Sequence, residues 1–340
     1  MSQPDLDILG IGNAIVDVLA RAEDGFLEAN GMTKGGMRLI GAEEAEALYG
    51  RMGPGVESSG GSVANSCAVA AGLGARVGFL GKVATDALGT VFAHDIRAAG
   101  VHFPTPPLET KGQGFAPTAR CLILVTPDGQ RTMNTFLGAC VHFSEADVDA
   151  AEVARARVVY LEGYLFDPPA AQSAFTAAAR AAHAAGRQVA LSLSDAFCVE
   201  RHREAFHRFV REETDILFAN ETELLSLYEV DSFGAAEALV RQEVSLAVLT
   251  RSERGSVVLT RAERHEVAAV PTRVVDTTGA GDAYAAGFLA ALTRGLPLPE
   301  AGRWGAVAAS EVISHFGARP QADLKALIGA GERGISALLG

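Results

Sequence analysis

The stretch DTTGAGDAYAAGF, residues 276–288, decides the fold. It follows a β-branched run at 273–275, which predicts a strand, and it passes into a small-residue apolar helix at 283–292. The glycines leave the backbone amides of residues 279–282 free to converge on an anion, and the helix dipole adds partial positive charge. A strand, a glycine-rich turn and a helix N-terminus therefore predict an anion-binding turn in an α/β domain.

A carboxylate follows this turn at once. Asp282 is placed to accept a proton from an attacking hydroxyl, while the amides of Gly279, Ala280 and Gly281 stabilise charge on a transferred phosphoryl group. The structural alternative is that Asp282 caps the helix and the glycines only make the turn. The turn alone does not decide between these two interpretations.

Composition excludes several classes of protein. The net charge of −12 is the reverse of a nucleic-acid-binding footprint, and no apolar run reaches the roughly 18 residues of a membrane span. The opening residues MSQPDLDIL have no basic and apolar signal-peptide pattern, which predicts a cytoplasmic protein. The four cysteines lie far apart in sequence, which favours small buried side chains over a zinc site or disulfides.

Strand and helix patterns alternate along most of the chain. Apolar strand patterns at 77–80, 158–161, 189–193, 216–218 and 246–250 are interleaved with helical patterns, which predicts a doubly wound, mostly parallel sheet. Between about residues 103 and 138 two β-rich segments, 118–125 and 131–136, flank the turn signal PDG at 127–129. This predicts a hairpin outside the main sheet.

The 276–288 stretch resembles the C-terminal signature of ribokinase/PfkB carbohydrate kinases. The segment GGSVAN at 60–65, which is followed by Gly74, Gly81 and Gly89, resembles a second signature of that family. The resemblance covers essentially the whole chain and implies a ribokinase-like fold. It assigns residues 1–16, 41–108 and 137–340 to a large α/β domain that binds nucleotide and substrate, and residues 17–40 and 109–136 to a small β-sheet lid. It also implies ATP and Mg²⁺, and leaves open a requirement for K⁺.

Candidate substrate residues cluster in four places. Gly60 and Gly61 let backbone approach a ligand closely, and Asn65 offers a donor and an acceptor beside Ser62; the alternative is a glycine turn with Ser62 as helix cap. Asn13 and Asp17 are similar in position to the residues that hold the ribose hydroxyls in adenosine kinases of this family. Tyr164 and Phe197 correspond to aromatic positions that pack a purine ring, and core packing is the alternative for each.

The resemblance also supplies nucleotide and metal residues. Asn220 and Glu223 are similar to the family's Asn-x-x-Glu element, in which Glu223 organises magnesium-bound water; a helix cap with an acidic first turn is the alternative. The phosphate and nucleotide contacts implied by the resemblance are Thr250, Arg251, Gly255, Thr278 and Arg131. An exposed hairpin arginine is the alternative interpretation of Arg131.

Together these residues predict ATP-dependent phosphorylation of the ribose 5'-hydroxyl of adenosine, giving AMP and ADP. Two alternatives remain open: a PfkB-type kinase for a pentose or hexose, and a non-catalytic ligand-binding regulator with a kinase fold. The intact turn at 279–282 argues against the regulator. The expected partners are a small-molecule substrate, either nucleoside or sugar, and ATP, without nucleic acid or membrane. The sequence does not distinguish a monomer from a homodimer.

Overall fold

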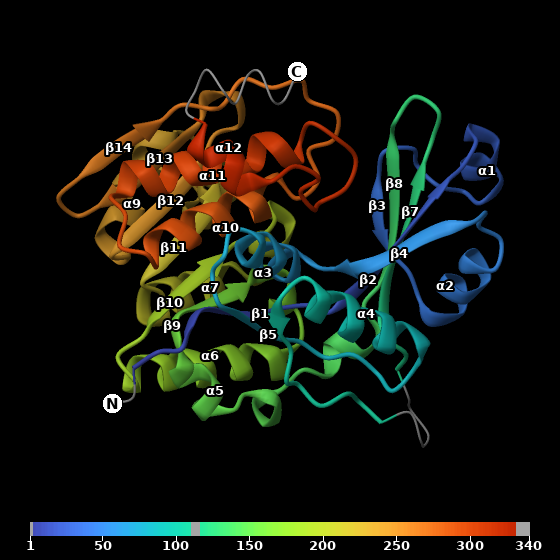
Figure 1. Cartoon of the computed structure of the whole chain (residues 1–340), viewed down its shortest axis with the longest axis horizontal. Helices are drawn as coiled ribbons and strands as arrows, with labels where there is room; N and C mark the ends of the chain where they lie inside the picture. The colour runs from blue at the N-terminus through green and yellow to red at the C-terminus, as the bar shows by residue number, and fades with distance from the viewer. Residues whose placement is uncertain (1–2, 110–115, 331–340) are drawn as a thin grey trace.

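The computed structural model describes residues 3–109 and 116–330, and its strands build two separate sheets (Figure 1). The large sheet has nine strands in the order β14-β13-β12-β11-β10-β9-β1-β5-β6. It is parallel from β6 to β12, and β13 and β14 are antiparallel additions. Its strands are β1 Leu6–Ile11, β5 Val77–Leu80, β6 Val101–His102, β9 Ala156–Glu162, β10 Gln188–Ser192, β11 Ile216–Asn220, β12 Leu246–Thr250, β13 Ser256–Thr260 and β14 Arg264–Val267.

Helices cover both faces of this sheet, so its central strands are apolar on both sides. One face packs against α3 Ser62–Gly72, α4 Ala87–Ala98, α10 Ala280–Leu292, α11 Leu298–Val312 and α12 Leu324–Gly329. The other face packs against α5 Ala150–Arg155, α6 Pro169–Ala184, α7 Ala196–Glu213, α8 Glu221–Tyr228 and α9 Phe233–Glu243. Short 3₁₀ turns are η1 Gly138–His142, η2 Glu145–Asp147, η3 Gly163–Phe166 and η4 Ser252–Arg254. This arrangement confirms the predicted doubly wound α/β fold.

The small sheet stands beside the large body, at the right of Figure 1. Its strands are β2 Ile15–Arg21, β3 Met37–Leu39, β4 Gly55–Gly60, β7 Ala119–Val125 and β8 Arg131–Phe136, in the order β3-β8-β7-β2-β4. The helices α1 Asp24–Ala29 and α2 Ala42–Tyr49 accompany it. β7 and β8 pair antiparallel across the PDG turn, which confirms the predicted hairpin.

The small sheet extends beyond the segments predicted for the lid. β4 pairs antiparallel with β2 over residues 55–60, and these residues were expected in the large domain. Their sequence, GVESSG, contains one β-branched residue and no alternating pattern, so local propensity does not mark it as a strand. Pairing with β2 supplies the structure. Residues 110–115 of the predicted lid lie outside the described residues.

The strand expected at residues 273–275 is absent from the structure. These residues are an irregular segment that leads into the glycine-rich turn, and Val274 is 58% exposed. The backbone N–H of Val275 donates to the carbonyl of Ile313, at 2.8 Å, instead of joining a sheet. The β-branched composition was therefore misleading here, because no neighbouring strand is available for pairing.

The helix that carries Asp282 is fixed by close packing against α11. A Cβ added at Gly287 would lie 2.5 Å from the backbone oxygen of Trp304, and one added at Gly305 would lie 2.8 Å from that of Tyr284. These glycines let the two helix backbones approach, which sets where the N-terminus of α10 points. All four cysteines are buried free thiols. None of the helices in the described residues has the length and apolar character needed to cross a membrane.

Candidate active site

The glycine-rich turn shapes the N-terminus of α10. Gly279 has φ 76°, and a Cβ there would lie 2.7 Å from the Cβ of Ala318, so both backbone conformation and space require glycine. A Cβ at Gly281, by contrast, would meet no atom within 4 Å. The turn therefore leaves open space beside the first amides of α10, as an anion site at a helix N-terminus requires.

Asp282 lies in the first turn of α10 and is held by α3. Ser62 Oγ donates to Asp282 Oδ1 at 2.5 Å, and Ser66 Oγ donates to the backbone oxygen of Asp282 at 3.0 Å. The Asn65 side chain, on the same helix, also favours the ionised Asp282 carboxylate. Burial raises the pKa of Asp282 to about 6, against the opposing effect of Ser62 and Asn65. The two sequence signatures thus meet in space at one carboxylate.

A second carboxylate, Asp17, belongs to the small sheet. Burial raises its pKa to about 6, and the positive charges of Arg131 and Arg319 oppose that rise. A Cβ added at Gly60 would lie 2.4 Å from Asp17 Oδ2, so glycine is needed where β4 passes this side chain. Within the described residues Asp17 accepts no hydrogen bond from protein, so its oxygens remain available to a ligand.

Asn13 is buried beneath the glycine pair. Its Nδ2 donates to Glu162 Oε1 at 2.7 Å, and its backbone oxygen would lie 2.1 Å from a Cβ at Gly61, where φ is 102°. Asn13 therefore packs against the backbone of the substrate signature. Part of its hydrogen-bonding capacity is taken by Glu162.

Glu162 is a site residue that the sequence did not single out. It ends β9, is 1% exposed, and also accepts from the Val63 N–H at 2.9 Å. Burial raises its pKa to about 7, and hydrogen bonds from Val63 and Asn13 oppose that rise. Its position at the carboxyl end of a predicted strand was the available signal, since ligands of open α/β sheets bind at that edge.

Arg131 crosses from the small sheet to the glycine-rich turn. Its Nη1 forms a very short ion pair with Asp276 Oδ2, and both side chains are under 10% exposed. Asp276 also accepts from the backbone N–H of Thr278 at 3.0 Å and of Gly317 at 3.1 Å. Although burial acts to raise the pKa of Asp276, these hydrogen bonds and Arg131 hold it below its usual value. Arg131 is thus a buried ion-pair partner, not an exposed hairpin side chain.

Two aromatic side chains follow neighbouring strands of the large sheet. Tyr164 lies in η3 after β9 and is 37% exposed, and Phe197 lies in the first turn of α7 after β10 and is 71% exposed. Neither belongs to a hydrophobic core, so the core-packing alternative does not describe them. The charges that act on Tyr164 include those of Asp195 and Asp282.

The Asn220 and Glu223 pair forms a complete capping box at the start of α8. Asn220 Oδ1 accepts from the Glu223 N–H, while the two Glu223 oxygens accept from the Asn220 backbone N–H at 2.9 Å and from Nδ2 at 2.6 Å. Burial raises the pKa of Glu223 to about 7. The helix-cap interpretation accounts for both side chains in this structure.

The turn after β12 carries Thr250, Arg251 and Gly255. Gly255 has φ 76°, and a Cβ there would lie 2.1 Å from the backbone oxygen of Val267. Arg251 binds Glu221 at 3.2 Å, and its guanidinium carbon lies 3.9 Å from the centre of the Phe233 ring. These contacts place the Arg251 guanidinium against α8 and α9.

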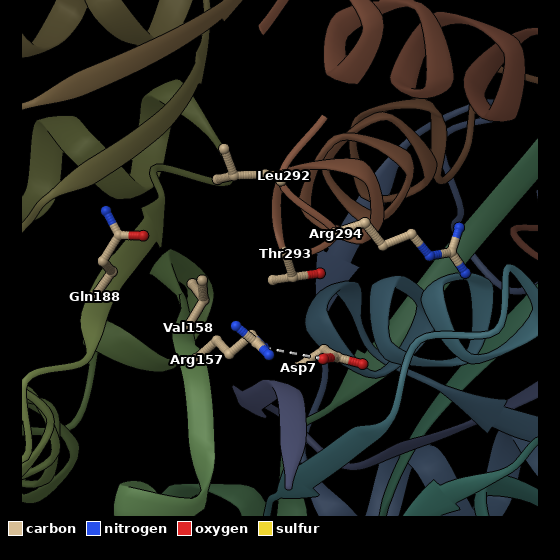
Figure 2. A pocket seen from close by; sticks show the side chains of 8 residues that line it. Asp7, Arg157, Val158, Gln188, Leu292, Thr293 and Arg294 are labelled. Atoms are coloured by element: carbon tan, nitrogen blue, oxygen red, sulfur yellow. Dashed lines mark ion pairs between the residues drawn. The ribbon is translucent and has the colours of Figure 1, made fainter. Parts of the chain in front are cut away.

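Two cavities lie elsewhere. One, of about 580 Å³, lies at the amino ends of β1, β9 and β10, where Arg157 points toward Asp7 (Figure 2). It borders Leu292 at the far end of α10 from Asp282. The other, of about 1010 Å³, runs along α4. No predicted site residue lines either cavity, so neither is part of the candidate site.

Comparison with known proteins gives the family. Residues 31–324 match the model of the pfkB family carbohydrate kinase. The chain belongs to the pfkB family of carbohydrate kinases. As a pfkB kinase it is a phosphotransferase that acts on a hydroxyl group.

Relatives of this pfkB kinase include both nucleoside and sugar kinases. It is 53% identical to the adenosine kinase from Sinorhizobium meliloti, with a TM-score of 0.86 and coverage of 94% of this chain and 98% of that one. It is 49% identical to a probable sugar kinase from Rhizobium etli CFN 42, with a TM-score of 0.88 and coverage of 97% and 100%. Adenosine kinase 2 of Arabidopsis thaliana is 26% identical over 341 residues, covering 91% of this chain and 94% of that protein.

Proposed function

We propose that this pfkB kinase transfers a phosphoryl group from ATP to the ribose 5'-hydroxyl of adenosine, giving ADP and AMP, with Asp282 as the base. The observation that carries the proposal is the position of Asp282 in the first turn of α10, where Ser62 and Asn65 of the substrate signature hold its carboxylate. The same activity would place the protein in purine salvage, and a cytoplasmic location fits it.

Asp282 takes the proton from the attacking hydroxyl in this proposal. The open space beside Gly281 and the dipole of α10 fit the polyphosphate of ATP, because both favour a negatively charged group at the helix N-terminus. The amides of Gly279 and Gly281 stabilise charge on the transferred group as the oxygen attacks, whereas the Ala280 N–H donates to the Thr277 carbonyl at 3.2 Å. Asp282 and these amides thus act on opposite ends of the forming bond.

The substrate assignment rests on Asp17 and on the two exposed aromatic rings. Asp17 accepts no hydrogen bond from the described residues, and a carboxylate with free oxygens suits the two adjacent hydroxyls of a ribose. Tyr164 and Phe197 offer apolar ring faces at the carboxyl edge of the sheet, where a purine would stack. A bare sugar would leave both rings uncovered.

A sugar kinase remains the second candidate. Glu162 does not decide between the two, because it is 1% exposed and its oxygens accept from Asn13 and Val63. The similarity to the probable sugar kinase from Rhizobium etli CFN 42 supports the same alternative.

A substrate panel tests the two candidates. We expect kcat/KM for adenosine to exceed that for ribose, fructose and fructose 6-phosphate by about 10²-fold or more, measured by coupled ADP release. Burying a purine face against Tyr164 and Phe197 should contribute about 2 to 3 kcal/mol at roughly 25 cal/mol per Å². That remote binding energy also helps position the 5'-hydroxyl, so kcat should rise as well as affinity. Efficient phosphorylation of a hexose without turnover of adenosine would reject the nucleoside assignment and keep the kinase.

Glu223 is the residue proposed to organise magnesium-bound water. The residue fits an outer-sphere role, since a carboxylate at the start of α8 keeps lone pairs beyond its two hydrogen bonds from Asn220. When bound with ATP, Mg²⁺ would neutralise phosphate charge. Whether K⁺ is also needed stays a prediction.

Replacing Glu223 by glutamine should raise the Mg²⁺ concentration required for half-maximal activity several-fold, with little change in KM for adenosine. The reason is that glutamine keeps the side-chain size but loses the negative charge. Titration of activity with Mg²⁺ at saturating ATP measures the effect. Glu229→Gln, at the exposed C-terminal end of α8, is the control. An unchanged Mg²⁺ requirement in Glu223→Gln would leave Glu223 as a cap only.

A further inference from the structure

Arg319 reaches from the segment after α11 into the candidate site. Its Nε donates to Asn65 Oδ1 at 2.9 Å, and its Nη2 donates to the backbone oxygen of Ser59 at 2.7 Å and to Ser59 Oγ at 2.9 Å. Asn65 belongs to α3 and Ser59 to β4, so one guanidinium joins the large body to the small sheet. Sequence inspection gave no reason to single out this arginine.

The contact with Arg319 determines how the Asn65 amide is oriented. An asparagine side chain has one accepting oxygen and one donating NH₂ group, and a guanidinium only donates. Because Oδ1 of Asn65 accepts from Arg319, its Nδ2 is the group turned toward the nearby Asp282 carboxylate, whose ionised form Asn65 favours. The opposite orientation would place oxygen against oxygen at Asp282 and nitrogen against nitrogen at Arg319. Donors and acceptors along Arg319, Asn65 and Asp282 therefore match in only one orientation of the Asn65 amide.

Arg319 is also the cation that acts on Asp282 in a strongly acidic neighbourhood. The other ionisable groups that face Asp282 are Asp17 from β2, Tyr160 and Glu162 from β9, Tyr164 from η3 and Glu223 from α8. The carboxylates among them disfavour an ionised Asp282, as does burial. A positive charge nearby opposes both effects, and the same charge acts on Asp17.

We propose that Arg319 is a positioning residue for proton transfer: it fixes the Asn65 amide with its NH₂ group toward Asp282, and its charge keeps that carboxylate ionised and ready to accept the hydroxyl proton. This inference rests on the proposed role of Asp282 as base. Because the same guanidinium holds Ser59, it also fixes β4 of the small sheet, whose neighbour β2 carries Asp17, relative to Asp282. Arg319 acts through Asn65 and the charge at the site, without needing to contact substrate.

The test is the pH dependence of kcat with ATP and adenosine, or with the sugar that the substrate panel selects. In Arg319→Met the acidic limb should move to higher pH by about 0.5 to 1 pH unit, because the carboxylate loses a nearby cation and a fixed donor. The loss of kcat should accordingly be about two- to fivefold greater at pH 6 than at pH 8. Arg319→Lys, which keeps the charge and a donor, should recover most of the wild-type profile.

A double-mutant cycle with Asn65→Ala tests the route through the amide. If Arg319 acts through Asn65, the loss of kcat in the double variant should be smaller than the product of the two single losses. Fully multiplicative losses would overturn the positioning role.

Arg294→Met is the matched control, since Arg294 donates to the Leu73 carbonyl at 2.6 Å and its guanidinium lies over the Trp304 ring. It should lower the melting temperature and leave the pH profile unchanged. If Arg319→Met does not fold, Arg319→Gln is measured in its place. A wild-type pH profile in a folded neutral variant would overturn the inference, whereas normal turnover in Asp282→Asn would instead reject the proposed base.

Discussion

Replacing Asp282 by asparagine is expected to lower kcat by about 10²- to 10⁴-fold while leaving the Kd values for ATP and adenosine within a few-fold of wild type. Asp282 does not cap α10, whose N-cap is Gly279, and an asparagine of nearly the same size can still accept the hydrogen bond from Ser62. The substitution therefore removes the base and preserves the contact with Ser62. Single-turnover kinetics together with equilibrium binding separate the chemical step from affinity.

The control for this substitution is Asp149→Asn at the N-cap of α5, which should leave kcat unchanged. Near-normal turnover in Asp282→Asn would leave Asp282 only as a structural partner of Ser62.

The pH profile of the wild-type enzyme adds an independent check. The base must be ionised to accept a proton, and burial raises the pKa of Asp282 to about 6. Turnover should therefore be lost as the pH falls through about 6 and reach a plateau above about 7. An acidic limb near pH 4, the value for an unperturbed carboxylate, would contradict this assignment.

Adenosine should be preferred over 2'-deoxyadenosine by about 10²-fold or more in kcat/KM, and Asp17→Ala should remove most of that preference. The reason is that a buried carboxylate left without its hydroxyl partner is costly, and hydrogen bonds to charged groups contribute about 1.5 to 3 kcal/mol. In Asp17→Ala no carboxylate is left to bind the 2'-hydroxyl of adenosine. The kcat/KM values for the two substrates should therefore converge. Comparison of kcat/KM for both substrates in both enzymes measures the coupling.

Asp24→Ala provides the control, because it removes an exposed acidic side chain from α1 of the same small unit. It should retain the wild-type preference. Equal use of both nucleosides by the wild-type enzyme would mean that Asp17 does not hold the 2'-hydroxyl.

Local features of the site could be predicted from sequence because a few consecutive residues produce them. The glycine-rich turn before α10 and the capping box of Asn220 and Glu223 each depend on the backbone of one turn, although α10 begins at Ala280, three residues before the predicted start. The hairpin of β7 and β8 follows in the same way from two β-rich segments around PDG. In each case the interactions span at most a few positions.

Longer-range features were missed or wrongly placed. β4 has little intrinsic preference for a strand and forms one because β2 lies beside it, while residues 273–275 have the preference but no partner. The exposed-side-chain alternative for Arg131 was wrong, because the structure pairs it with Asp276, 145 positions away, while its role as a phosphate contact stays a prediction. Such outcomes depend on which segments the fold brings together.

By itself, the sequence determined the doubly wound fold, the glycine-rich turn at residues 279–282 and the family signature at residues 60–65, because each is recorded in the pattern of contiguous residues. The tertiary structure alone decided which side chains surround Asp282. Arg319 is 254 positions from Asn65, and Glu162 is 149 positions from Asn13, and no local pattern connects either pair. The physical reason is that burial and charge at a site are properties of the packed molecule, set by segments that meet only when the sheets and helices are in place.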